Sequence, residues 1–124
     1  MGLALYQLGD YNRAVAHCAE AVRLDPSAFG PYVDMARALS ALGNSDEALR
    51  YYAEALRLNP GIAQIHYYIG SEWMKRGAFG LAAGSFGEAV RLAPAWAEAR
   101  AQLQHAIDAE NQPPIGTNEY NLTE

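Results

Sequence analysis

The sequence predicts an all-α protein, a superhelix of about seven helices that lie in antiparallel pairs. The main observation is a seven-residue phrase that occurs three times, at Glu20–Pro26, Glu54–Pro60 and Glu88–Pro94. Its proline recurs at positions 26, 60 and 94, which is a period of 34 residues. A fixed period of this length is typical of stacked repeats. Each phrase also reads as a helix end, because Ala, Leu and Arg favour helix and proline stops it.

Length and composition fit one soluble domain. The chain has 124 residues, is 51% hydrophobic and carries a formal charge of −5. Because it also lacks a run of Lys and Arg, nucleic acid and anionic membranes are poor partners. No apolar stretch approaches the length of a membrane span, so we expect no direct membrane insertion. The single Cys18 and the lack of a signal-peptide pattern predict a reducing compartment, the cytoplasm.

The first repeat unit, residues 1–26, is truncated. Residues 1–8 are predicted to be the end of a helix, and Gly9 begins a turn. Residues 11–24 follow as a second helix, with apolar side chains at helical spacing. Since about half of the first helix is missing from the repeat pattern, Met1 falls inside a helix. We therefore expect the chain to be part of a larger protein.

The second unit, residues 27–60, is complete. Its helices are predicted at 28–41 and 45–58, with a glycine turn between them. Ser45 or its neighbour Asn44 is a candidate N-cap for the second of these helices. The residues expected to face the core in the first helix are Tyr32, Met35, Ala36 and Leu39.

The third unit, residues 61–94, follows the same plan. Its helices are predicted at 62–75 and 79–92. Residues 95–110 are expected to form a last helix that has no partner after it and caps the array. Residues 111–124 are mostly polar and contain two adjacent prolines, so we expect an extended or disordered tail.

One pattern of small, aromatic and proline residues recurs in each unit. In the third unit it consists of His66, Ile69, Gly70, Trp73, Ala82, Phe86 and Pro94. In the second unit it consists of Tyr32, Met35, Ala36, Leu39, Ala48, Tyr52 and Pro60. The first unit retains Gly2, Leu5, Ala14, Cys18 and Pro26. These residues resemble the tetratricopeptide repeat (TPR) family, whose pattern is W-x2-L-G-x2-Y, then A-x3-F, then P. The small residues are expected to let paired helices approach closely.

The resemblance implies a protein–protein interaction scaffold. In TPR proteins the first helices of the units line a concave groove in which peptides bind. Carried over to this sequence, the groove residues are Tyr6, Asp34, Arg37, Gln64, Tyr67, Tyr68, Ser71, Met74, Lys75, Glu98, Gln102 and His105. Aromatic rings with polar neighbours suit the recognition of a protein or peptide partner. For Tyr67 and Tyr68 one alternative stays open, namely that they pack between adjacent first helices.

The chain departs from one known TPR specificity. TPR proteins that bind chaperones hold the C-terminal carboxylate of a peptide in a clamp of Lys, Asn and Arg side chains. At the matching positions this chain has Leu3, Asp34, Gln64 and Tyr68. The carboxylate of Asp34 would repel that of the peptide. We therefore predict no binding to acidic chaperone tails.

Self-association into a homo-oligomer is the alternative function. The truncated N-terminal edge would leave an apolar helix face under-covered, and such edges favour contact between copies. Gly80, Gly84 and Gly87 are expected on the outer face of a helix, where each costs about 1 kcal/mol relative to Ala. Close approach of another helix would offset that cost. The C-terminal tail is the third candidate surface.

Nothing in the sequence predicts an enzyme. His17, His66 and His105 lack the spacing of a metal or protease motif. For Cys18 the sequence offers neither a positioned base nor a cause for a lowered thiol pKa. The glycines of residues 77–87 are not followed by Gly-Lys-Ser/Thr, so they do not form a phosphate loop. We predict no catalytic residue, no metal and no cofactor.

Overall fold

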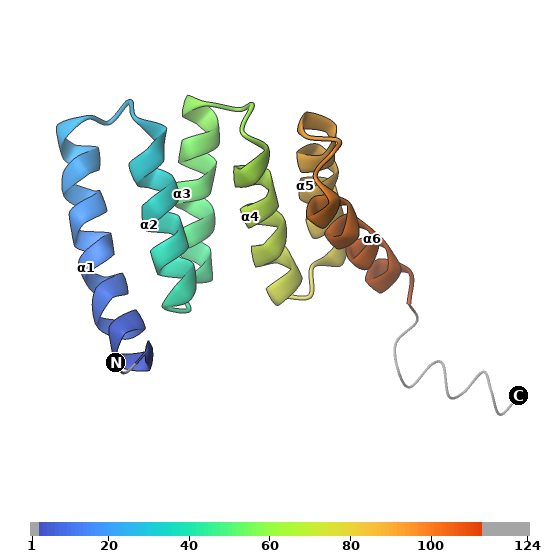
Figure 1. Ribbon diagram of the computed structural model, residues 1–124, viewed down its shortest axis with the longest axis horizontal. Coiled ribbons are helices and arrows are strands. Elements are labelled where there is room, and N and C mark those ends of the chain that lie inside the picture. Colours follow the sequence, from blue (N-terminus) through green and yellow to red (C-terminus); the bar gives the residue numbers. More distant parts are fainter. Residues whose placement is uncertain (1–2, 113–124) are drawn as a thin grey trace, which may run out of the picture.

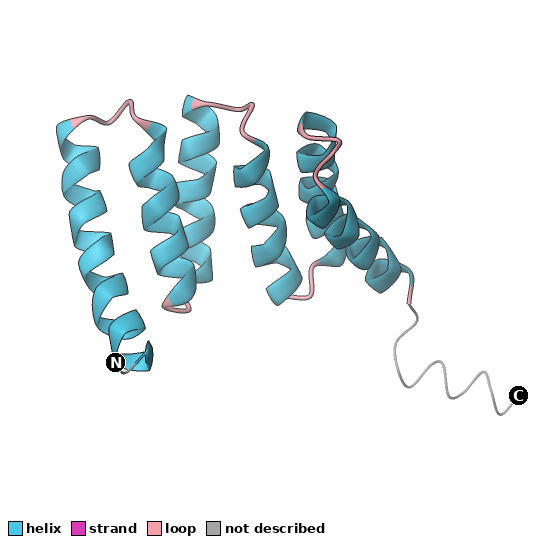
Figure 2. Ribbon diagram, viewed as in Figure 1, coloured by secondary structure: helices cyan, strands magenta, loops and turns pink. Residues whose placement is uncertain are grey.

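The computed structural model describes the backbone of residues 3–112 and the side chains of residues 10–112. Within this part of the chain there are six α-helices and no strand (Figure 2). The helices are α1 (Leu3–Leu24), α2 (Phe29–Ala41), α3 (Ser45–Leu58), α4 (Ala63–Lys75), α5 (Phe79–Leu92) and α6 (Ala97–Asn111). None of the six is long and apolar enough to cross a membrane.

The helices form a superhelical row of antiparallel neighbours, as the sequence predicts. Figure 1 shows α1 at one end of the row and α6 at the other, with short loops that connect successive helices alternately at the top and the bottom of the view. The packing is most extensive between α2 and α3 and between α4 and α5, and it is sparser between α3 and α4. The row therefore consists of tightly packed helix pairs joined by a looser seam.

The prediction of a turn at Gly9 is wrong, because α1 runs without a break through it. Gly43 and Gly77, at the same position of the period, do form turns and adopt left-handed φ values of 88° and 75°. Continuing the helix keeps the backbone groups hydrogen-bonded, although a helical glycine costs about 1 kcal/mol. The described part of the chain therefore has six helices, close to the predicted count of about seven.

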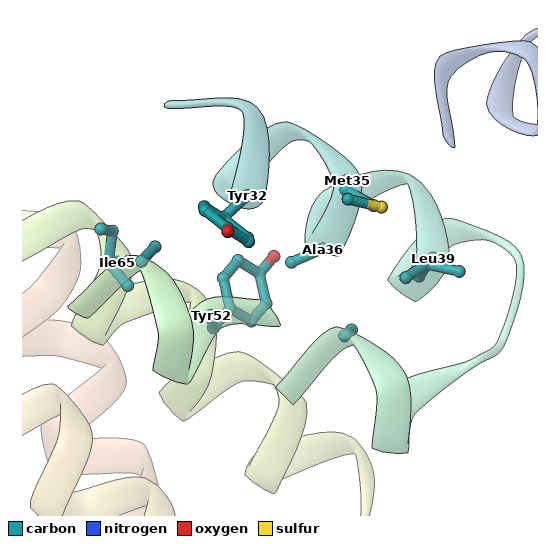
Figure 3. Close-up of a cluster of buried hydrophobic side chains, with 8 residues drawn as sticks. Tyr32, Met35, Ala36, Leu39, Tyr52 and Ile65 are labelled. Carbon is teal, nitrogen blue, oxygen red and sulfur yellow. The ribbon is translucent and has the colours of Figure 1, made fainter. Parts of the chain in front are cut away.

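The core lies between neighbouring helices, both within the pairs and between them. The larger buried cluster comes from α2, α3 and the start of α4, and Figure 3 shows the rings of Tyr32 and Tyr52 lying close together in it. Its members are Tyr32, Met35, Ala36, Leu39, Ala48, Tyr52, Ala55 and Ile65. The core face predicted for residues 28–41 is thus confirmed. A second cluster is centred on Ala82, Phe86 and Ala106 of α5 and α6.

The small residues of the repeat pattern lie where paired helices touch. Ala36, Ala48 and Ala82 are completely buried. Gly70 of α4 faces the ring of Phe86 on α5, and a Cβ built on this glycine would lie 2.8 Å from two ring carbons. That distance is shorter than a carbon–carbon contact at its energy minimum, about 3.5–4.0 Å. Close helix approach, as expected from the sequence, is therefore confirmed at these positions.

Candidate functional site

A pocket opens between α2 and α4, on the face that these two helices share. Its volume is about 220 Å³. It is lined by Arg37, Ser40, Ala41, Tyr52, Tyr68, Ser71, Glu72 and Lys75, and we call it the central pocket. Four residues predicted from the sequence, namely Arg37, Tyr68, Ser71 and Lys75, are brought together here.

The floor of the central pocket is aromatic. The rings of Tyr68 and Tyr52 are stacked with centroids 5.7 Å apart. The guanidinium carbon of Arg37 lies 5.1 Å from the centroid of the Tyr68 ring, which is a cation–π contact. Gln64 donates a hydrogen bond of 3.0 Å from Nε2 to the hydroxyl of Tyr68. Tyr68 therefore both packs against the core and lines the pocket, and its neighbours fix its orientation.

A buried carboxylate lies beneath the pocket. Glu72 is 2% exposed and accepts hydrogen bonds from the hydroxyls of Ser40 and Ser45 and from the ammonium group of Lys75. Lys75 Nζ also donates to Ser40 Oγ at 2.7 Å. Burial alone would raise the pKa of Glu72, but these hydrogen bonds outweigh burial and hold its pKa below the usual value. We call Glu72, Ser40, Ser45 and Lys75 the Glu72 network.

The Glu72 network joins two helix pairs across their seam. Ser40 is on α2, Ser45 begins α3, and Glu72 and Lys75 are on α4. Beside it, Arg76 forms an ion pair with Asp46 of α3. The polar contacts thus lie where α3 and α4 pack less extensively than the paired helices do.

Sequence reasoning missed Glu72 and misread Ser45. The position 34 residues before Glu72 is occupied by Ala38, which is buried, at 3% exposure. A charged residue at a position that is apolar in the preceding unit was therefore the signal by which Glu72 could have been found. Ser45 does not cap α3, since neither it nor Asn44 makes a side-chain cap hydrogen bond. Its hydroxyl donates to Glu72 instead. Local spacing predicts a cap, whereas the actual partner lies 27 residues away.

A second hollow, of about 250 Å³, lies between α1 and α2. Asp34 lines this hollow, and Arg37 lines both it and the central pocket. The other lining residues are Tyr11, Ala14, Ala38 and Ala41. Tyr6 is placed in α1 by its backbone, but its side chain lies outside the described part of the chain.

The remaining predicted site residues lie toward α6. The ring of Tyr67 stacks on Trp96 with centroids 4.7 Å apart and meets Phe86 edge-on at 5.4 Å. Burial, followed by the charge of Glu98, raises the pKa of Tyr67. Met74 packs against the second core cluster. Tyr67 and Met74 are therefore partly core residues, while Gln102 is half-buried on α6 and His105 is exposed there.

The histidine and cysteine side chains outside the central pocket are not arranged as a metal site or a catalytic site. Among the described residues no group of three His, Cys, Asp or Glu side chains converges as metal ligands would. Burial, and then the charge of Asp34, raises the pKa of the Cys18 thiol. His66 lies 3.2 Å from the carbonyl oxygen of Pro60. A raised thiol pKa is the opposite of what a cysteine nucleophile requires.

The glycines of α5 leave one helix face uncovered. A Cβ built on Gly84 or Gly87 would meet no atom within 4 Å, and one on Gly80 would meet only the side chain of Glu110 of α6. Leu81 on the same helix is 57% exposed. Among the described residues, nothing presses against Gly84 or Gly87.

Comparison with family models places the chain among repeat proteins. Residues 33–95 match a model described as a tetratricopeptide repeat, and residues 1–28 match a second model with the same description. Comparison with curated protein sequences gave no significant match.

Solved structures with the same fold include three informative examples. A MamA RS-1 ArsTM double mutant is 28% identical with a TM-score of 0.79, and the match covers 84% of this chain and 58% of that one. The Yersinia enterocolitica type III secretion chaperone SycD, in complex with a peptide of the translocator YopD, is 15% identical with a TM-score of 0.78 and 86% of each chain covered. PcrH, in complex with the chaperone binding region of PopD, is 20% identical with a TM-score of 0.79, and 89% and 88% of the two chains are covered. This chain thus spans little more than half the length of the MamA chain.

Proposed function

The chain belongs to the tetratricopeptide repeat family, and we propose that it is a protein–protein interaction scaffold, part of a larger protein, that binds a peptide segment of its partner in the groove along α2, α4 and α6. The observation that carries this proposal is the central pocket, which gathers Arg37, Tyr68, Ser71 and Lys75 from two helices. The SycD and PcrH structures support it, because each contains a segment of a partner protein bound to the same fold.

The central pocket has the chemistry of a peptide-binding surface. Tyrosine rings give contact area at a small entropic loss, and arginine and tyrosine are enriched among the residues that dominate binding energy. We assign the pocket, with its volume of about 220 Å³, to one large apolar side chain of the bound segment. Arg37 and Lys75 are exposed at its edge and can bond polar groups of the same segment.

Selection from a phage-displayed library of random peptides tests the proposal. Peptides retained by the wild-type chain are measured by calorimetry against Arg37→Glu and against the control Arg100→Glu. Arg100 is exposed on α6 two residues from both Glu98 and Gln102, so it points to a different side of that helix. We expect Arg37→Glu to weaken binding at least about tenfold, as loss of a central contact does, and Arg100→Glu to leave it unchanged. Peptides that respond equally to both substitutions would refute a site at the central pocket.

A further inference from the structure

We propose that the partner segment carries one acidic residue directly beside a large apolar residue, and basic residues on either side of this pair. The apolar side chain enters the central pocket, and the carboxylate binds between Arg37 and Lys75 at its edge. This inference rests on the proposed function, because it specifies the chemistry of the same groove.

Arg37 is oriented but carries no ion pair. Its guanidinium lies over the ring of Tyr68, with the guanidinium carbon 5.1 Å from the centroid. Among the side chains of residues 10–112, no carboxylate comes within ion-pair distance of Arg37. A guanidinium binds a carboxylate in a planar, two-pronged geometry, and one that is already held in place loses less entropy when it does so.

Lys75 supplies the second positive charge. Its ammonium group donates to Ser40 Oγ at 2.7 Å and lies 3.2 Å from Glu72 Oε2, while its side chain remains 56% exposed. An ammonium group has three donors, so one is left for a ligand. Glu72 is buried and already accepts three hydrogen bonds, and it therefore presents no free acceptor to the groove. The pocket lining has two cations and one buried carboxylate, a local charge of +1 in a chain whose formal charge is −5.

An acidic residue lies on either side of the central pocket. Asp34 lines the hollow between α1 and α2. Glu98 lies at the start of α6, close enough to affect the pKa of Tyr67. The carboxylates of Asp34 and Glu98 therefore flank the central pocket, on the sides of α1 and α6 respectively. Complementary potentials select the partner and its register, and like charges placed opposite one another disfavour wrong partners. A run of several acidic residues would place carboxylates against Asp34 and Glu98, so we expect the groove to disfavour it.

The peptide selection described above gives the first test when its products are sequenced. We expect Asp or Glu beside a large apolar residue more often than in the starting library, with Lys or Arg within a few positions. In a parallel selection on Arg37→Glu, whose side chain lies outside the Glu72 network, this acidic preference should disappear. Circular dichroism of the variant establishes that it is folded, and Arg37→Gln serves as a second, milder variant.

A thermodynamic cycle on the tightest peptide gives the second test. Replacing its acidic residue by the amide should weaken binding to the wild-type chain about tenfold, and should change binding to Arg37→Gln much less. Peptides without acidic enrichment, or an amide effect of equal size on both proteins, would overturn this inference while leaving groove binding intact. Peptides that do not respond to any substitution in the central pocket would overturn the proposed function as well.

Discussion

Replacing Gly70 by alanine should destabilise the protein, whereas the same replacement at Gly84 should stabilise it. Both glycines lie inside helices, α4 and α5 respectively. A Cβ at Gly70 would lie 2.8 Å from Cδ1 and Cε1 of Phe86, whose ring is completely buried. A Cβ at Gly84 would have nothing within 4 Å. The two variants therefore differ in packing and not in the chemistry of the substitution.

The magnitude follows from two opposing effects. Alanine in place of a helical glycine adds about 1 kcal/mol to the free energy of unfolding. Restoring an ordinary contact at Gly70 requires the Phe86 ring or α4 to move by about 0.7–1.2 Å, and such overpacking costs about 1–3 kcal/mol. Gly84→Ala should thus gain about 1 kcal/mol, while Gly70→Ala should lose up to about 2 kcal/mol.

Urea unfolding followed by far-UV circular dichroism measures both variants. Phe86→Leu provides the cross-check, because a smaller side chain makes room for the added methyl group. The stability lost through Phe86→Leu should be smaller in the Gly70→Ala background than in the wild type. If Gly70→Ala stabilised the protein as much as Gly84→Ala does, the close approach of α4 and α5 would be refuted.

The remaining predictions concern charged groups. Glu72→Gln should lower the free energy of unfolding by about 2–3 kcal/mol, because hydrogen bonds to a buried charge are lost. The exposed control Glu47→Gln should change this free energy by less than about 0.5 kcal/mol in the same urea assay. Since the pKa of Glu72 is lowered in the folded state, its contribution is complete above the unfolded pKa of about 4.3 and is lost as pH falls through the lower folded pKa. The wild type should therefore lose more stability on acidification than Glu72→Gln does, and equal losses would contradict the network. A peptide with an acidic chaperone tail should give no binding in calorimetry at micromolar concentration, and a measurable affinity would refute the clamp comparison.

The repeat period predicts most of the fold because its signals are local. The helices predicted at 45–58 and 79–92 are found at Ser45–Leu58 and Phe79–Leu92. The same signal fails at Gly9, where α1 continues through the glycine. Tertiary context, which the local pattern does not contain, decides that case.

The sequence predicted only those residues of the candidate site that occupy equivalent positions in successive 34-residue units. Arg37, Tyr68, Ser71 and Lys75 face one pocket because the first helices of successive units present the same side. Glu72 escaped notice because its serine partners lie 32 and 27 residues away in the sequence. Pairing at that range depends on how two units stack, and no spacing within one unit encodes it.

The Glu72 network also makes the units of this array non-interchangeable. The residues 34 positions after Ser40 and Ser45 are Met74 and Phe79, neither of which can donate a hydrogen bond to a carboxylate. If the third unit were duplicated and stacked on itself, the second copy of Glu72 would be buried without its hydroxyl donors, at a penalty of several kcal/mol. The third unit therefore depends on the second, which supplies the hydroxyl donors for its buried carboxylate. Lengthening this array by tandem duplication would require compensating changes at the seam, whereas point changes on the groove surface would not.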